Sequence, residues 1–391
     1  MTVNIASFAA PGSATLSPDL PQPGSAADHW AYATTLVLFE GKMRALFSML
    51  FGASMLLFIE RQDAAGRDGI ALQVRRLLWL ALIGYAHFAL LWNGDILFLY
   101  ACVGLGAMFL RQGNPIALAL SGLLLFAAWQ GIGASAWLPS AAQEARIAAG
   151  TATPADQSAH ANLVEQRRRD DQTDTAEALD SFTGAAKARL ERDSGYPLRV
   201  VAYNWGETLT YILFGMALLR SGFFDGNWPR RMMIRLACVS LFAGLFPTLA
   251  FAAWAEMSAY PQAAMHLALS YGLGFPHLLM ALGYAALLML AAPRLLATAP
   301  GRWIEAAGRA AFSNYLGTTL LMTALFSGWG LALFGEYGAA ARWYFVLLGW
   351  AAMLCWPTPW LRFYRCGPLE WLWRSLTEWR ILPIRRSPVR T

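Results

Sequence analysis

The chain has 391 residues, of which 57% are hydrophobic and only 14% are charged, and it contains 17 Trp. Soluble proteins carry about 25% charged residues, so the composition argues against a soluble enzyme, a nucleic-acid-binding domain and a secreted disulfide scaffold. The net charge of +6 comes with arginines that cluster at the ends of apolar stretches, a pattern that favours a helical membrane protein over a phosphate-binding surface.

Residues 1–40 are expected to form an irregular external segment. Prolines, serines and glycines are frequent between Pro11 and Ala27, and the segment has neither the basic start nor the apolar core of a cleavable signal. An external position without a signal requires a preceding membrane span. The sequence therefore predicts that an upstream helix belongs to this protein.

The apolar runs predict an all-α, polytopic transmembrane bundle of about nine spans, within a range of about eight to ten. Four isolated cysteines show no metal-ligand spacing, so no metal site and no disulfide framework are expected. The predicted spans lie at about residues 43–60, 75–92, 95–111, 116–137, 200–220, 232–254, 270–292, 310–334 and 342–361.

Basic residues are concentrated on alternate connections between these spans. Four arginines lie in residues 61–76, one in 111–115, four in 220–235, three in 294–309 and seven from Arg362 onwards. Loops rich in Lys and Arg remain in the cytoplasm. The C-terminus, with a basic tail at residues 381–391, is therefore predicted to be cytoplasmic.

Residues 139–199 form the one long polar stretch and are predicted to be an external loop. Small and apolar residues recur in its second half at helical spacing, which favours an amphipathic helix that lies on the bilayer or caps the bundle. Binding of an acceptor molecule is the alternative interpretation. The residues with this spacing are Ala176, Leu179, Phe182, Ala186 and Leu190.

The second span carries the residues that point to chemistry. An ionisable side chain inside an apolar span is costly, so His87 is expected to line a cavity or the bundle interior. Arg76 precedes it by about three helical turns, which places both on one helix face about 16 Å apart along the axis. The two residues could line one conduit. Alternatively, His87 hydrogen-bonds a neighbouring helix and Arg76 anchors the cytoplasmic end.

Asp95 follows at a short hairpin after the second span. If the hairpin is recessed, the carboxylate could fix the tautomer of His87 and raise its basicity, as in acid–base dyads. By the same reasoning as for His87, Glu207 in the fifth predicted span is expected to line a cavity or the bundle interior. A run of helix breakers before His277 favours a packing kink over a substrate site, and Asn314 is expected to hydrogen-bond between helices.

Several of these segments resemble the YeiB family of bacterial inner-membrane proteins, which contains a domain of unknown function. The resemblance extends from about residue 4 to about residue 380 and is most specific near the C-terminus. Its motifs lie at residues 39–42, 44–52, 76–101, 308–316 and 367–377.

The resemblance implies a multi-pass protein of the inner membrane with two helical halves, at residues 41–138 and 200–380. That family is similar to the transmembrane acyltransferases, one branch of which has a signature of an Arg, ten intervening residues and a His. Arg76 and His87 stand at this spacing. Family members usually open with a further helix that ends near a Val-Asn-Ile sequence. This chain begins there, which agrees with the expected upstream helix.

The resemblance favours an acyltransferase that moves an acyl group from cytoplasmic acyl-CoA to an external hydroxyl or amine. His87 and Asp95 would be catalytic, Arg75 and Arg76 would bind the acyl donor, and acyl-CoA would be a co-substrate rather than a bound cofactor. Expected partners are membrane lipid and an envelope glycan or small-molecule acceptor, without nucleic acid, and an oligomer is possible. A proton-coupled transporter and a non-catalytic membrane protein are the alternatives.

Overall fold

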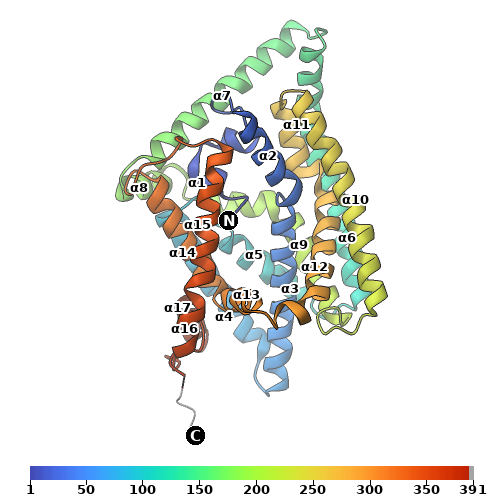
Figure 1. Ribbon diagram of the computed structural model, residues 1–391, viewed down its shortest axis with the longest axis vertical. Helices are drawn as coiled ribbons and strands as arrows, with labels where there is room; N and C mark the ends of the chain where they lie inside the picture. Colours follow the sequence, from blue (N-terminus) through green and yellow to red (C-terminus); the bar gives the residue numbers. More distant parts are fainter. Residues whose placement is uncertain (387–391) are drawn as a thin grey trace.

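The computed structural model describes residues 1–386, and this part of the chain is helical without a β-sheet. Helices pack side by side along the long axis, and α7 crosses the bundle at the end away from the C-terminus (Figure 1). The predicted all-α class is therefore confirmed. Within residues 1–386, six helical segments are long and apolar enough to cross a membrane, so this is a membrane protein. The first joins α2 and α3 and the last joins α15 and α16. The segments are Ala26–Ala64, Gly69–Leu90, Pro115–Ala148, Arg230–Met257, Gly274–Leu295 and Ala339–Phe363.

The other three predicted spans also contain helices, but these are shorter or more polar. The third is short, with α5 at Leu97–Ala107 followed by the 3-10 turn Met108–Leu110. The fifth, α9 at Tyr196–Arg220, has 25 residues but includes charged side chains. The eighth, α14 at Ala311–Phe326, has 16 residues and ends earlier than the predicted residue 334. It ends where the following turn meets α7, because the Gly328 amide donates to the Ala178 carbonyl oxygen at 2.8 Å.

The prediction that residues 1–40 are irregular is wrong. They contain α1 at Ile5–Ala9, a 3-10 turn at Gly12–Thr15 and α2 at Ala26–Leu38. Ser25 and Asp28 form a reciprocal capping box that starts α2. A break at Gly41, with φ 73°, separates α2 from α3 at Lys42–Ala64.

The prediction of one amphipathic helix across residues 176–190 is also wrong. The structure has two helices here, α7 at Pro154–Ala178 and α8 at Phe182–Asp193. Ser181 caps α8 by accepting a hydrogen bond from the Gly184 amide at 3.1 Å, which interrupts the helical spacing. In addition, α6 at Pro115–Ala148 continues past Pro139 into the stretch that was expected to be loop.

The seventh span is broken as its helix-breaking residues predict. Here α11 at Gln262–Leu267 leads through a π-helical turn at Ala268–Gly272 into α12 at Gly274–Leu295, which packs along α10 at Arg230–Met257. The C-terminal part continues through short helices to the end of the described chain. These are α13 at Ala299–Arg309, α15 at Ala339–Cys355, α16 at Pro357–Phe363 and α17 at Pro368–Thr377.

The two halves of the chain share a core, because α3 packs closely against α9. A Cβ atom at Gly52 would overlap the backbone of Ile212, and one at Gly215 would overlap the backbone of Met49. Only glycine permits this approach of the two helix backbones. The contact fixes α3 and α9 relative to each other, and both helices carry charged residues of the cavity described below.

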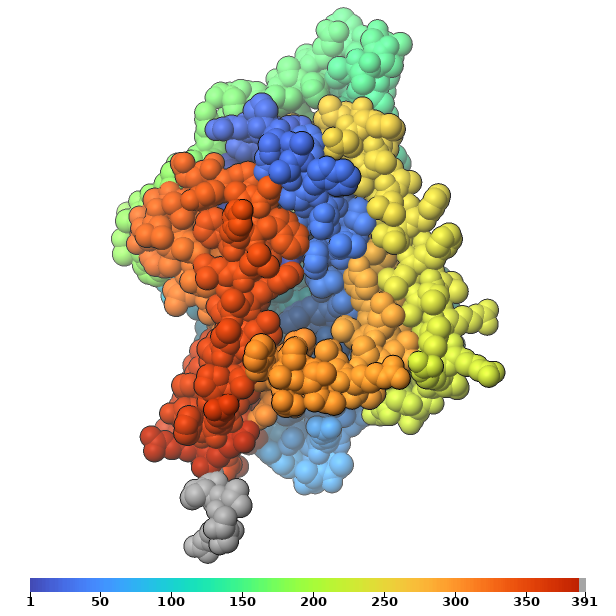
Figure 2. Space-filling view, viewed as in Figure 1, coloured from blue at the N-terminus to red at the C-terminus, as the bar shows by residue number. Residues whose placement is uncertain are grey.

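Connections that are rich in arginine meet at one end of the bundle, as alternate loops of a membrane protein should. Arg67 pairs with Glu378 at 2.6 Å, and Arg220 donates to the Gly113 carbonyl oxygen at 2.7 Å. At the opposite end, the Gly12 amide donates to Asp174 of α7 at 3.1 Å. Figure 2 shows a hollow on one face of the molecule, bounded by the N-terminal helices in blue and the C-terminal helices in orange and red.

Candidate functional site

His87 and Asp95 form a buried dyad between α4 at Gly69–Leu90 and the start of α5. His87 Nδ1 lies 2.8 Å from Asp95 Oδ1, and the two side chains are only 1% and 2% exposed. The other oxygen, Asp95 Oδ2, accepts a hydrogen bond from the Phe98 amide at 2.9 Å. A Cβ at Gly84 would overlap the Phe98 amide, so glycine is required where α4 meets this hairpin.

The carboxylate defines the protonation of the imidazole. A carboxylate can only accept hydrogen bonds, so in the neutral imidazole Nδ1 of His87 carries the hydrogen and Nε2 is an acceptor. Nε2 is buried and has no hydrogen-bond partner among residues 1–386. This is the orientation in which an imidazole can accept a proton from a substrate.

Aromatic residues enclose the dyad. The rings of Tyr315 and Trp92 have centroids 5.3 Å and 6.4 Å from that of His87. Trp92 is in turn stacked on Phe8 of α1 at 4.0 Å, and its indole Nε1 is buried without a partner in the described chain. The surroundings of the His87 ring are therefore largely aromatic, and the Trp92 indole is a free donor within residues 1–386.

The two arginines that were expected to bind an acyl donor lie at the other end of α4. Arg75 is exposed, whereas Arg76 is half-buried between the rings of Phe58 and Trp373, 4.0 Å and 4.3 Å from their centroids. Trp373 also donates to the Arg76 carbonyl oxygen at 2.9 Å. The guanidinium of Arg76 thus packs between α3 and α17, and a conduit that it shares with His87 is not seen.

A second site, a cavity of about 660 Å³, lies toward the opposite end from the arginine-rich connections. It is lined by residues of α2, α3, α6, α9, α11, the π-helical turn and α15 and by the N-terminal segment, and neither His87 nor Asp95 lines it. The aromatic lining residues are Tyr32, Trp129, Trp137, Tyr203, Tyr271 and Trp343, and the ionisable ones besides tyrosine are Glu40, Arg44, Glu207, His266 and Arg342.

An ion pair forms the polar floor of this cavity. Arg44 Nη2 donates to Glu207 Oε1 at 3.1 Å, and the Tyr211 hydroxyl donates to the same oxygen at 2.7 Å. The Glu207 side chain is 7% exposed, whereas that of Arg44 is 39% exposed. The arginine therefore presents part of its guanidinium to the cavity, and the glutamate holds it in place.

Glu40 and Arg342 are the other Glu and Arg residues of the lining, and neither forms an ion pair or hydrogen bond with another side chain within residues 1–386. No side chain in the described part of the chain donates a hydrogen bond to Glu40, which lies between α2 and α3. Arg342 of α15 donates through Nε to the Tyr337 carbonyl oxygen at 2.9 Å, and its terminal amino groups have no acceptor within residues 1–386.

The residues before His277 contribute to the cavity in a way that was not predicted. His277 itself does not line it, because this side chain is 1% exposed and packs against Gly41, where a Cβ would overlap the ring. The π-helical turn instead turns Tyr271 toward the cavity. Asn314 bridges helices as expected, since its amide donates to Met353 and its oxygen accepts from Trp356.

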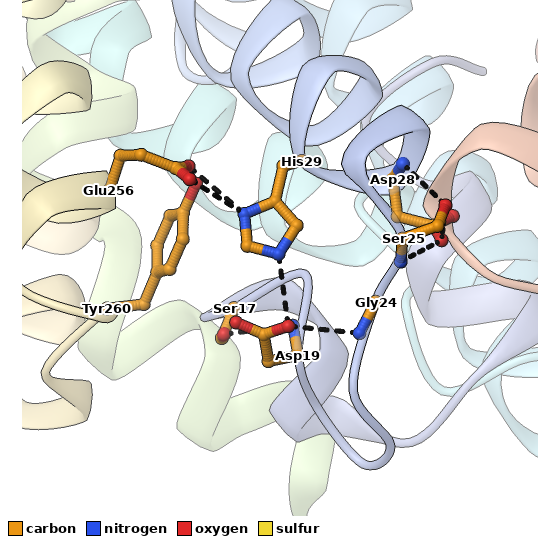
Figure 3. A network of polar contacts seen from close by, with 8 residues as sticks. All are labelled: Ser17, Asp19, Gly24, Ser25, Asp28, His29, Glu256 and Tyr260. Carbon is orange, nitrogen blue, oxygen red and sulfur yellow. Dashed lines mark hydrogen bonds and ion pairs between the residues drawn. The ribbon is translucent and has the colours of Figure 1, made fainter.

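A strap of residues 10–24 closes one wall of the cavity. The Tyr32 hydroxyl donates to the Thr15 carbonyl oxygen at 2.9 Å, and Thr15 lines the cavity. His29 lies between two carboxylates, with Nε2 3.0 Å from Asp19 and Nδ1 3.0 Å from Glu256 (Figure 3). The strap is thus tied to both α2 and α10.

The strap also contacts α7, outside the spans. The Ser13 amide donates to Asp171 at 3.2 Å, next to the bond between Gly12 and Asp174. Burial raises the pKa of the Asp174 carboxyl, while the Gly12 amide opposes this shift. Among residues 1–386 no group of three or more His, Cys, Asp or Glu side chains could hold a metal ion.

Comparisons with known proteins identify relatives across almost the full chain. Residues 218–380 match a family described as "Protein of unknown function (DUF418)". The protein YeiB of Escherichia coli (strain K12) is 31% identical, over 96% of this chain and 92% of its own length. YxaH of Bacillus subtilis (strain 168) is 26% identical, over 93% of this chain and 86% of its own. No solved structure matches the chain.

Proposed function

The chain belongs to the YeiB family, and we propose that it is an acyltransferase that moves an acyl group from acyl-CoA to an acceptor hydroxyl or amine across a membrane. The proposed location is the bacterial inner membrane, with the C-terminus in the cytoplasm. The acceptor would be an envelope glycan, a lipid or a small molecule that reaches the protein from outside.

One observation carries the proposal, namely the buried contact between His87 and Asp95 with Nε2 left free. In the proposed reaction Nε2 takes the proton from the acceptor O–H or N–H, and the acceptor atom bonds to the thioester carbonyl carbon. The C–S bond then breaks, and the departing CoA thiolate receives the proton from the imidazolium. Asp95 stabilises the imidazolium while it exists, as carboxylates do in other acid–base pairs.

The placement of the basic residues supports entry of acyl-CoA from the proposed cytoplasmic end. Arg75 is exposed at that end, and the Arg67–Glu378 pair lies nearby in sequence on the same connection. Arginine side chains match phosphate groups well because the planar guanidinium can donate two parallel hydrogen bonds. From Arg75 to His87 the distance along α4 is about 18 Å, which is within reach of a long, flexible thioester arm.

A transporter is the second candidate, and a different observation favours it. The cavity contains a buried ion pair, and two of the helices that line it are interrupted, at Gly41 and at the π-helical turn Ala268–Gly272. Broken helices and charged groups at a cavity are features of solute transporters. A transporter would move its solute without using acyl-CoA.

Labelled acetyl-CoA separates these candidates. Membranes from cells that produce the protein are incubated with acetyl-CoA labelled in the acetyl group, and the products are compared with those of membranes that lack it. The proposal predicts a new labelled species that depends on the protein. His160→Gln, a change in α7, where no described side chain is fully buried, serves as the matched histidine control and should retain it. The absence of any new species would contradict the proposal and favour a transporter or a non-catalytic protein.

A further inference from the structure

We propose that the cavity binds a small zwitterion of the phosphoethanolamine class, with its ammonium group at Glu40 and its phosphate at Arg342. The inference does not rest on acyl transfer, because binding is measured without an acyl donor. It rests on two charged side chains of opposite sign that line an aromatic cavity and have no ion-pair partner within residues 1–386.

The charges that line the cavity are balanced, which argues against a ligand of large net charge. Glu40 and Glu207 carry two negative charges, and Arg44 and Arg342 carry two positive ones. Glu207 and Arg44 form an ion pair with each other, although Arg44 Nε has no hydrogen-bond partner within residues 1–386. The remaining two groups, Glu40 and Arg342, are the ones that a ligand can pair, and they have opposite signs.

Glu40 is suited to the cationic end of the ligand. It follows α2 directly, lines the cavity and receives no side-chain hydrogen bond within the described residues. A charged group that is removed from water is costly unless it is paired. Tyr32 and Trp343 line the same cavity, and an ammonium group is also attracted by aromatic faces.

Arg342 is suited to the anionic end. The residue is 7% exposed, and its Nε bond to the Tyr337 carbonyl oxygen fixes the guanidinium while leaving both terminal amino groups for a ligand. The two terminal amino groups of a guanidinium can donate parallel hydrogen bonds to two oxygens of one phosphate. The two ends lie on neighbouring elements, because Phe39, next to Glu40, contacts Trp343, next to Arg342, with ring centroids 5.9 Å apart.

The size and setting of the cavity fit this class of ligand. Its volume of about 660 Å³ lies within the usual range of about 300 to 1,000 Å³ for small-molecule sites. In a membrane, an ammonium and a phosphate occur together in the zwitterionic headgroup of phosphatidylethanolamine. The same chemistry is offered by free phosphoethanolamine, so the experiment must separate the two sources.

Binding to the purified full-length protein in detergent tests the proposal. Phosphoethanolamine, ethanolamine and methyl phosphate are titrated separately by calorimetry, and we expect the zwitterion to bind at least tenfold more tightly than either half. Glu40→Gln should weaken phosphoethanolamine at least tenfold but leave methyl phosphate unchanged. Arg342→Gln should weaken phosphoethanolamine and methyl phosphate but leave ethanolamine unchanged.

Controls keep this result interpretable. Arg235→Gln removes an exposed arginine of α10 outside the cavity and should bind like the wild type. Each variant is accepted only if it elutes as a single species and unfolds cooperatively. If an Arg342→Gln protein fails to fold, Arg342→Lys, which keeps the charge but loses the two parallel donors, replaces it and should show partial weakening.

Lipid competition separates the two sources. Nanodiscs of phosphatidylethanolamine that displace the free probe, when phosphatidylglycerol nanodiscs do not, would identify a lipid headgroup, whereas displacement by neither would identify a soluble ligand. Both results support the proposal. Equal affinity for the zwitterion and its two halves, no binding of any probe, or unaltered binding in both variants would overturn it.

Discussion

The His87–Asp95 dyad and the cavity lined by Glu40 and Arg342 differ in how they treat water and charge. The dyad is sealed, with side chains 1% and 2% exposed, and its one free atom is a proton acceptor. The cavity is open enough to leave the Arg44 side chain 39% exposed, and its charged groups are spread over facing helices. A sealed imidazole suits proton transfer, whereas an open set of fixed charges suits recognition. On this basis we assign the chemistry to the dyad and the binding of a ligand to the cavity.

The largest expected effect comes from a substitution in the dyad. Asp95→Asn presents an amide to His87 Nδ1, so the imidazole loses its ionic partner and its fixed tautomer. Acyl transfer should fall by about 10² to 10⁴-fold, the usual contribution of a positioned acid–base group. The rate of label transfer measures this, and phosphoethanolamine binding should stay unchanged. Asp225→Asn, in an exposed loop, is the matched control.

A second substitution tests the close contact between α3 and α9, which positions charged residues of the cavity. Gly52→Ala places a methyl group against the backbone of Ile212 and should destabilise the protein by about 1 to 3 kcal/mol, as overpacked cores do. Gly317→Ala lies on an exposed face of α14 with open space around it, so it should be neutral or slightly stabilising. Denaturation of both variants in detergent measures the difference. Equal stability would show that the α3–α9 contact is not tight.

A third change removes the floor of the cavity. Glu207→Ala leaves Arg44 without its partner, and we expect a loss of about 2 kcal/mol. This is less than the roughly 3 to 5 kcal/mol of a fully buried pair, because Arg44 is partly exposed. Glu60→Ala breaks a surface pair with Arg220 at 3.5 Å and should cost less than about 1 kcal/mol. Similar losses in the two variants would contradict the assigned role of Glu207.

The smallest expected effect concerns the strap that covers the cavity. His29 can donate to both Asp19 and Glu256 only as an imidazolium, whereas the neutral ring loses one of the two bonds. Tyr260 donates to Glu256 on the same side at 2.5 Å. The strap should therefore be held more firmly at low pH and loosen as pH rises past the titration of His29.

Hydrogen exchange measures this loosening. Amides of residues 10–24 should lose protection by a few-fold between acidic and alkaline conditions, after correction for intrinsic exchange rates. In His29→Asn the protection should be lower and independent of pH over the same range. A strap that is equally protected at all pH values in the wild type would show that the His29 contacts do not hold it.

The sequence predicted the dyad because its parts are close along the chain. His87 and Asp95 belong to one helical hairpin, so the cost of an ionisable group in an apolar span and a short connection were enough to suggest the contact. The helices could also be predicted from the sequence, because most of them coincide with apolar runs. Residues 26–38 were missed because prolines and glycines just before them favoured a loop, and the capping box at Ser25 was overlooked.

The cavity could not be predicted because its lining residues come from helices that are distant in sequence. Glu207 was expected to be buried, but nothing local indicates that it faces Arg44, 163 residues away. Arg342 gave no signal at all, since an arginine near a helix start is typical of an interfacial anchor. The environment of Arg76 could not be predicted from local spacing either, because Trp373, which covers it, belongs to a helix that is distant in sequence.

The most direct test of the account is acyl transfer by His87→Gln, compared with the wild type at equal abundance in membranes. Glutamine keeps a polar side chain of similar size but cannot accept a proton as imidazole does. The account predicts that the protein-dependent labelled species formed from acetyl-CoA is lost, while the variant binds phosphoethanolamine as the wild type does. Transfer at the wild-type rate by a folded His87→Gln protein would contradict the account.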